Sequence, residues 1–296
     1  MIWKILLIAI LIDLLFGEPP EKIHPVVWMG KLIDGLRAHM NKSKIDGVIV
    51  ALMVVGGFTL AGYLIISFVP GIVGLIISAY VLKATFSINC LAGTANMMEK
   101  YLASDDLETA KKNLPKLVGR DPSQLSKKEI NSAVIESVAE NFVDGIFSPL
   151  FYFLLFGLPG ALAYKAINTL DSMVGQGDFG YFSAKLDDLV NYIPARLSVL
   201  FISAGAIFYG SPLSALKISR RDHGLTKSPN SGWPMAAMAG SLAASLKKPD
   251  HYILGSELDM PESYHIKRAV RIMEIATTFL IIVSFTITYF VYLPLY

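Results

Sequence analysis

Two long uncharged runs constrain this chain more than any other feature. Residues 48–69 and residues 275–296 contain no Asp, Glu, Lys or Arg. At a helical rise of about 1.5 Å per residue, each run is long enough to cross a hydrocarbon core of about 30 Å. Both runs therefore predict membrane-crossing helices. The composition agrees, because 53% of the residues are hydrophobic, 17% are charged and the mean hydropathy is +0.52.

Four further apolar runs carry defects. Residues 1–17 lack the cleavage site of a signal peptide and contain Asp13, which favours a retained membrane helix. Residues 72–92 follow a Pro-Gly turn and contain Lys83, which must reach the interface or find a partner inside the membrane. Residues 147–163, broken by the string GLPG, and residues 197–210 each either cross the membrane or dip in and return.

The basic residues predict the orientation. Residues 18–46, 93–147 and 211–269 contain five, seven and eight Lys or Arg, whereas residues 164–195 contain two. The basic loops are expected in the cytoplasm, so the two doubtful segments either both cross or both return. We expect an all-α, multi-pass protein of the cell membrane with four to six apolar segments. It would form a single lipid-embedded domain over residues 1–296, with polar cytoplasmic loops at 93–147 and 211–270.

Several functional classes are disfavoured. The net charge of +2 is too small to suggest nucleic acid as a partner. The single cysteine, Cys90, excludes an internal disulfide and a cysteine metal cluster. The five histidines form no His-x-x-x-His pair, which argues against a zinc site. A homo-oligomer is compatible with the sequence, which leaves the oligomeric state open.

The string ESVAENFVDG places an acidic stripe at the start of an apolar segment. Ser126 and Glu129 form the capping-box pattern, so a helix is expected from there to about Gly145. Three carboxylates at four-residue spacing share one face of it, and they repel each other unless something compensates them. A solvated helix face explains such a stripe about as well as a divalent cation does. The three residues are Glu136, Glu140 and Asp144.

Further polar groups follow along the chain. The first group fits either a network of hydrogen bonds between helices or a functional site. The second group fits either a functional site or a helix that lies at the membrane interface. Turn chemistry and interfacial aromatic residues are the simpler explanation of two loop motifs, GEPP…HPV and SPNSGWP. The first group is Lys165, Asn168, Asp171 and Ser172; the second is Asp187, Asp188, Asn191 and Arg196; the loops add Glu18, His24, Asn230 and Trp233.

Taken together, these strings strongly resemble the adenosylcobinamide-phosphate synthase family of cobalamin biosynthesis. The match runs in the right order through GEPP, ESVAENFVDG, PGALAYKAINTLDSMVG, LDDLVNYIPARL and SPNSGWPMAAMAG. Two positions depart from the family pattern: Pro122 follows VGRD, and Met235 follows GWP. The resemblance implies ATP- and Mg²⁺-dependent amide formation between adenosylcobyric acid and aminopropanol or its phosphate.

The resemblance and the chemistry together suggest roles. A carboxylate is a poor electrophile, so ATP is expected to convert it to an acyl phosphate that the amine then attacks. Glu140 and Asp144 are the expected metal ligands, with Glu136 as a base or further ligand. Phosphate charge would be neutralised by Lys165 and Arg120, while Asn168 and Asp171 hold metal or orient the amine. The remaining expected nucleotide contacts are Asp121, Asn141, Asp187, Asp188 and Arg196, and the expected substrate contacts are Glu18, His24, Asn230 and Trp233.

Three alternatives remain open at this stage. A membrane prenyl- or alcohol-phosphate transferase would also place acidic motifs at helix ends, but the paired aspartate motifs of that class are missing. A transporter would use the broken helix and the buried lysines as a substrate path. A non-catalytic relative of the same family would keep the fold without the activity.

Overall fold

The computed structural model describes residues 2–119 and 121–292, and it is almost entirely helical within them. Within these residues, four helices are long and apolar enough to cross a membrane, by length and composition. They confirm an all-α, polytopic membrane protein, and the runs at 48–69 and 275–296 fall in the first and last of them as far as the description reaches. The four helices are Lys44–Phe68, Gly71–Ala103, Lys127–Val174 and Ser263–Phe290.

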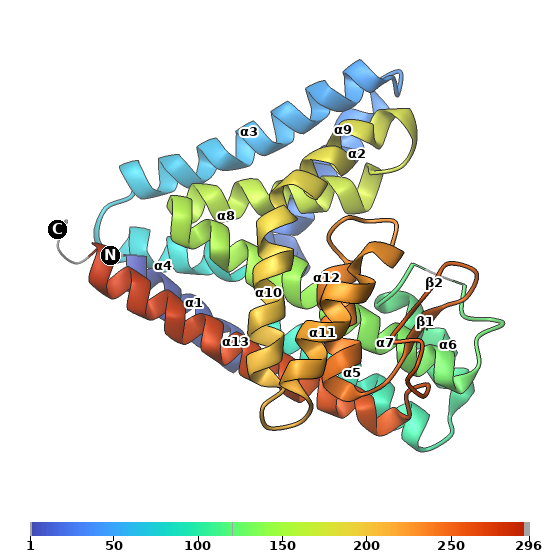
Figure 1. Ribbon diagram of the computed structural model, residues 1–296. Coiled ribbons are helices and arrows are strands. Elements are labelled where there is room, and N and C mark those ends of the chain that lie inside the picture. Colours follow the sequence, from blue (N-terminus) through green and yellow to red (C-terminus); the bar gives the residue numbers. More distant parts are fainter. Residues whose placement is uncertain (1, 120, 293–296) are drawn as a thin grey trace. The chain divides into compact units, whose positions relative to one another are not determined.

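The chain packs as two compact units. The first unit draws on Met1–Asn89, Asp144–Asn191 and Ile282–Tyr296. Its helices are α1 (Ile2–Phe16), α2 (Pro25–Ala38), α3 (Lys44–Phe68), α4 (Gly71–Lys83), α8 (Ser148–Val174) and α9 (Gly177–Val190), with a short 3-10 turn at Glu21–Ile23 (Figure 1). The expectation of a single domain over the whole chain stays a prediction.

Helix α3 packs on α8 and α9 through small residues. A Cβ atom at Gly47 would lie 1.9 Å from the carbonyl oxygen of Phe179, and one at Gly62 would lie 3.1 Å from the Cα atom of Pro159. Small residues let helix backbones approach closely where lipid supplies no hydrophobic driving force. Apolar side chains elsewhere on α3, such as Leu52 and Leu60, remain exposed, as expected of a face turned to lipid.

Helix α8 folds back on itself. Gly157 has φ 66° and ψ −157°, which are not helical, and Pro159 follows it. The rings of Tyr152 and Tyr164 stack with centroids 5.4 Å apart, whereas residues twelve apart in a straight helix are separated by about 18 Å. The segment 147–163 is therefore a returning helical hairpin, which was one of its two predicted forms.

A π-helical turn at Val143–Phe147 joins α7 to α8, so the predicted helix end near Gly145 is wrong. Pro149 has no N–H to donate to the carbonyl of Gly145 and its ring crowds that carbonyl, which favours a wider turn. The Gly145 oxygen instead accepts a hydrogen bond from the backbone N–H of Ser87 at 3.0 Å. The α-helical geometry that placed three carboxylates on one face therefore holds for Glu136 and Glu140, but not for Asp144.

The second unit draws on Cys90–Val143 and Tyr192–Ile281. In it α10 and α11 form another returning hairpin, and α12 packs on both (Figure 1). The doubtful segment 197–210 therefore also turns back, while the cytoplasmic placement of the basic loops stays a prediction. The helices are α5 (Ile88–Ala103), α6 (Leu107–Asn113), α7 (Lys127–Phe142), α10 (Tyr192–Gly205), α11 (Pro212–Asp222), α12 (Gly232–Leu242) and α13 (Ser263–Tyr292), with 3-10 turns at Leu114–Lys116 and His223–Leu225.

The predicted capping box at the start of α7 is confirmed. The Ser126 hydroxyl accepts from the backbone N–H of Glu129, and the Glu129 carboxylate accepts from the backbone N–H of Ser126. A small antiparallel hairpin, β1 (Leu246–Lys248) and β2 (Tyr252–Leu254), packs on α7. This hairpin was not expected from the sequence, and it brings new side chains to the acidic stripe.

Candidate functional site

The second unit contains a cavity of about 700 Å³ beside α7. Its lining comes from four separate stretches of sequence: residues 117–119, the middle of α7, residues 225–235 and the β1–β2 turn. A volume of this size falls in the range of small-molecule sites. The cavity contains two of the predicted residues, Glu136 and Glu140.

Glu136 is buried and held by two hydroxyl groups. The Ser132 hydroxyl donates to Glu136 Oε1 at 2.7 Å, and the Tyr252 hydroxyl donates to Oε2 at 2.9 Å. Ser132 also accepts from the backbone N–H of Lys247 at 2.7 Å, which ties the hairpin to α7. A buried carboxylate is costly without such donors, so these contacts stabilise one orientation of Glu136.

Basic side chains line the same cavity. Lys248 pairs directly with Tyr252 across the hairpin, so both side chains lie on the face that is turned to Glu136. Lys227 lines the cavity from the loop before α12. Neither lysine forms an ion pair with any residue within the described ranges. Glu140, one helical turn after Glu136, is exposed in the cavity wall.

Arg196, Asn230 and Trp233 meet elsewhere in the second unit. The guanidinium of Arg196 lies 3.5 Å from the ring centroid of Tyr192 and 5.1 Å from that of Trp233. It also donates to Asn230 Oδ1 at 3.3 Å, and the His223 ring stacks on Trp233 with centroids 3.8 Å apart. Two motifs that are distant in sequence are thus joined by cation–π and stacking contacts.

The other predicted nucleotide contacts of this unit, Asn141 and Asp121, form local hydrogen bonds. Asn141 donates to the carbonyl and hydroxyl oxygens of Ser137, one turn earlier in α7. Asp121 lies exposed in the loop before α7, where hydrogen bonds from the backbone N–H and hydroxyl of Ser123 hold the pKa of its carboxyl below the ordinary value. Arg120 lies outside the described residues.

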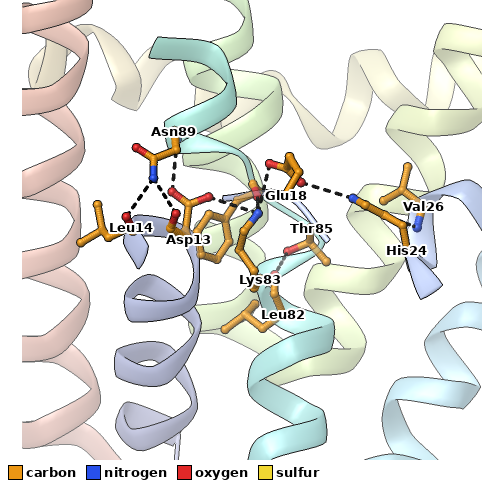
Figure 2. A network of polar contacts seen from close by, with 10 residues as sticks. Asp13, Leu14, Glu18, His24, Val26, Leu82, Lys83, Thr85 and Asn89 are labelled. Carbon is orange, nitrogen blue, oxygen red and sulfur yellow. Dashed lines mark hydrogen bonds and ion pairs between the residues drawn. The ribbon is translucent and has the colours of Figure 1, made fainter. Parts of the chain in front are cut away.

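A buried ionic network ties the first unit together (Figure 2). Lys83, whose side chain is 0% exposed, lies 3.1 Å from Asp13 Oδ1 and 3.1 Å from Glu18 Oε1. Its ammonium also donates to the carbonyl of Phe86 at 3.1 Å. Asn89 donates from its backbone N–H to Asp13 Oδ2 at 3.2 Å. Lys83 therefore has the partner that its place in an apolar run requires.

His24 extends this network. Its Nδ1 accepts from the backbone N–H of Val26 at 3.2 Å, so the proton of the neutral ring is on Nε2. Nε2 then donates to Glu18 Oε2 at 3.3 Å. Burial raises the pKa of Glu18, but the contacts from His24 and Lys83 outweigh it and leave that pKa below its ordinary value. Both side chains thus serve the network, and their role in substrate binding stays a prediction.

A second polar group in the first unit surrounds Asn191. The Asn191 Oδ1 atom accepts from the hydroxyls of Ser148 and Tyr164, both at 2.9 Å, while its Nδ2 donates to Asp187 Oδ2 at 3.0 Å. Burial and the nearby charge of Asp171 raise the pKa of Asp187 to about 6. A carboxylate tuned in this way can accept a proton near neutral pH.

The remaining predicted residues of this unit lie within electrostatic range of one another. Lys165 interacts electrostatically with Asp144, Glu18 and Asp187, and Asn168 lies close enough to Asp187 to lower the pKa of its carboxyl. Asp171 and Asp188 interact at the same end. The predicted residues of each unit therefore lie in more than one polar group.

Metal binding must be judged from the donors present. No group of three or more His, Cys, Asp or Glu able to hold a metal occurs within residues 2–119 and 121–292. Mg²⁺, however, is commonly held by one or two carboxylates together with substrate phosphates and water. Glu136 and Glu140 in the cavity fit that pattern, and the Mg²⁺ would neutralise charge on phosphate oxygens there.

Sequence reasoning missed several residues of these groups. Tyr252 and Lys248 lie in a stretch with no motif, and Lys227 directly precedes the SPNSGWP motif. Only the fold of the hairpin and loop brings the three residues to the cavity that contains Glu136. Tyr164 was hidden in an apolar run. Lys83 and Asp13 are both charged residues inside apolar runs. That property was the sequence signal of their pairing, and the structure places them 3.1 Å apart.

The fold and these groups define a polytopic helical membrane protein with a polar cavity and a buried charge network. The model of the CobD/Cbib protein family matches residues 6–278. The chain belongs to this family, as its motifs predicted.

Curated relatives agree. A probable cobalamin biosynthesis protein CobD of Methanothrix thermoacetophila is 42% identical and the match covers 92% of each chain. One of Methanothermobacter thermautotrophicus is also 42% identical, over 91% of this chain and 92% of the relative. The cobalamin biosynthesis protein CobD of Dehalococcoides mccartyi is 41% identical over 86% and 87%. No solved structure matches the chain significantly.

Proposed function

We propose that this protein catalyses ATP-dependent amide formation in cobalamin biosynthesis, in the cell membrane. The carboxylate substrate would be adenosylcobyric acid, and the amine would be aminopropanol or its phosphate. Family membership supports the pathway, and the observation that carries the chemistry is the cavity that three carboxylates and two lysines line. Amide formation at the expense of ATP needs that mixture, because phosphates, a divalent cation and a carboxylate substrate must be held together.

The reaction would proceed in two steps. A carboxylate oxygen of the corrinoid attacks the γ-phosphorus of ATP, which releases ADP and forms an acyl phosphate. The amine nitrogen then attacks the acyl carbon, inorganic phosphate leaves, and a base takes the amine proton. Glu140, which lines the cavity, is the proposed metal ligand there, with Glu136 as a base or further ligand. Asp144, Lys165 and Asp187 stay predicted functional residues of the first unit.

Product formation by the purified, full-length protein in detergent tests this proposal. With Mg·ATP, adenosylcobyric acid and either amine, the wild type should release ADP and a corrinoid amide in equal amounts. Glu140→Gln and Lys165→Ala should each lose at least about a hundredfold in rate, typical of removing a group that stabilises the transition state. Glu108→Gln, at an exposed position of α6, is the matched control and should keep wild-type activity.

Two results would count against the proposal. ADP release that does not depend on the corrinoid would indicate another ATP-dependent process. Absence of product with both amines, from protein that unfolds cooperatively, would favour a transporter or a non-catalytic relative.

A further inference from the structure

The cavity of the second unit is lined by two lysines. Lys227 and Lys248 line a cavity of about 700 Å³ from two different loops, and neither forms an ion pair within the described part of the chain. A lone exposed lysine is ordinary, but two that converge on one concave polar site create a local positive potential. Such a site attracts an anion.

The loop that carries Lys227 is ordered by its own hydrogen bonds. The Ser228 hydroxyl oxygen accepts from the backbone N–H groups of Asn230 at 3.2 Å and Ser231 at 3.3 Å. The Thr226 hydroxyl donates to the carbonyl of Ser228 at 2.9 Å. The hairpin that carries Lys248 is fixed to α7 through Ser132 and Tyr252. Both lysines therefore project from preorganised backbone, which lowers the entropic cost of binding.

The acidic side chains of the cavity narrow the choice of anion. Glu136, Glu140 and Asp250 line the same space, and they would repel a bare anion. A ligand with several anionic oxygens that brings a divalent cation removes this conflict, because the cation bridges the ligand to the carboxylates. Phosphate esters bound with Mg²⁺ are ligands of that kind.

We propose that the cavity binds a phosphate ester together with Mg²⁺, with Lys227 and Lys248 contacting phosphate oxygens and Glu140 facing the cation. The site rests on the proposed function for its role in catalysis, but not for the binding itself. The phosphate has two sources of the same chemistry, a nucleoside triphosphate or the phosphorylated amine. Nothing in the family match or the relatives' names assigns these lysines a role.

Calorimetric titration of the full-length protein in detergent tests the site without activity. The probes are an ATP analogue with an imido bridge between the β- and γ-phosphates, inorganic tripolyphosphate and aminopropanol phosphate, each with and without Mg²⁺. We expect Mg²⁺-dependent binding that falls about tenfold or more in Lys227→Ala and in Lys248→Ala, because each loses a charge-assisted contact. Lys267→Ala, an exposed lysine of α13 in the same unit, is the matched control.

The probes separate the two sources. Tighter binding of the ATP analogue and of tripolyphosphate assigns the cavity to the nucleotide, whereas tighter binding of aminopropanol phosphate assigns it to the amine. Wild-type affinity in both lysine variants would overturn the proposal, since the phosphate would then bind elsewhere. Absence of binding by any probe would overturn it too.

The outcome is separable from that of the proposed function. Lysine-dependent phosphate binding without corrinoid product would leave this site standing and remove the synthase activity. Corrinoid product at the wild-type rate and KM from both lysine variants would support the proposed function and overturn the phosphate site.

Discussion

One lysine of the first unit and two lysines of the second differ in how their charge is compensated. In the first unit Lys83 is 0% exposed and its ammonium contacts Asp13, Glu18 and a backbone carbonyl, each at 3.1 Å. In the second unit Lys227 and Lys248 line a cavity and form no ion pair within residues 2–119 and 121–292. A buried charge is costly unless its partners surround it, whereas a cation in an open cavity keeps its water until a ligand replaces it.

This difference teaches how to separate structural from functional charges in one membrane protein. The charges of the first network are satisfied by each other, so removing one leaves the others uncompensated. The lysines of the cavity do not compensate buried charges, so removing them should affect ligand binding more than the stability of the fold. Three substitutions test this difference between structural and functional charges.

Replacing Lys83 should have the largest effect. Lys83→Met leaves Asp13 and Glu18 without their cation, and breaking a buried pair in this way costs about 3–5 kcal/mol. Reversible unfolding in mixed micelles should show this loss, whereas Lys31→Met at an exposed position of α2 should not. Adding Asp13→Asn and Glu18→Gln should recover part of the loss, because the uncompensated charges are then removed. Wild-type stability of Lys83→Met would contradict a structural role.

Tyr252→Phe should have an intermediate effect. Glu136 is buried and would lose the hydroxyl that donates to Oε2 at 2.9 Å, which costs about 1–3 kcal/mol. The same unfolding measurement applies, with Tyr264→Phe at an exposed position of α13 as the control. If both variants unfold like the wild type, Tyr252 does not hold Glu136 in place.

The titration of Asp187 should have a smaller effect, because this residue is only half-buried. Its pKa is raised from 3.8 to about 6, so the unfolded chain releases this proton first as the pH rises. The contribution of the protonated carboxyl to stability is therefore complete below about pH 4 and is lost between about pH 4 and pH 6. Unfolding measured across this range should show the loss in the wild type and in Asp34→Asn, an exposed control. Asp187→Asn should not show it, and an unchanged pH dependence in that variant would refute the assignment.

Much of the fold was predictable because its signals are local. The uncharged runs, the capping box at Ser126 and Glu129, and the break at the GLPG string each lie within a few neighbouring residues. The π-helical turn was not predicted, since it depends on a non-local acceptor relation between Gly145 and Ser87 as well as on Pro149. The predicted acidic stripe is therefore correct for Glu136 and Glu140 and wrong for Asp144, which lies in the π-helical turn.

The candidate site was predictable only in part. Glu136 and Glu140 were identified because their spacing is a property of one helix. Tyr252 and Lys248 were not, because a two-stranded hairpin of three residues per strand leaves almost no pattern. Arg196 and Trp233 were each singled out, but their contact across a separation of 37 positions was beyond any local signal.

The sequence alone predicts a helical membrane protein of one family, because the length of a hydrophobic run and the presence of a short motif are local properties of the chain. The tertiary structure decided which charges are paired and which are free to bind. That choice depends on where distant segments meet, and on how much water each charge keeps when they do. Lys83 contacts two carboxylates in an apolar interior, and these contacts stabilise the fold. Lys227 and Lys248 line a polar cavity and form no ion pair within the described residues.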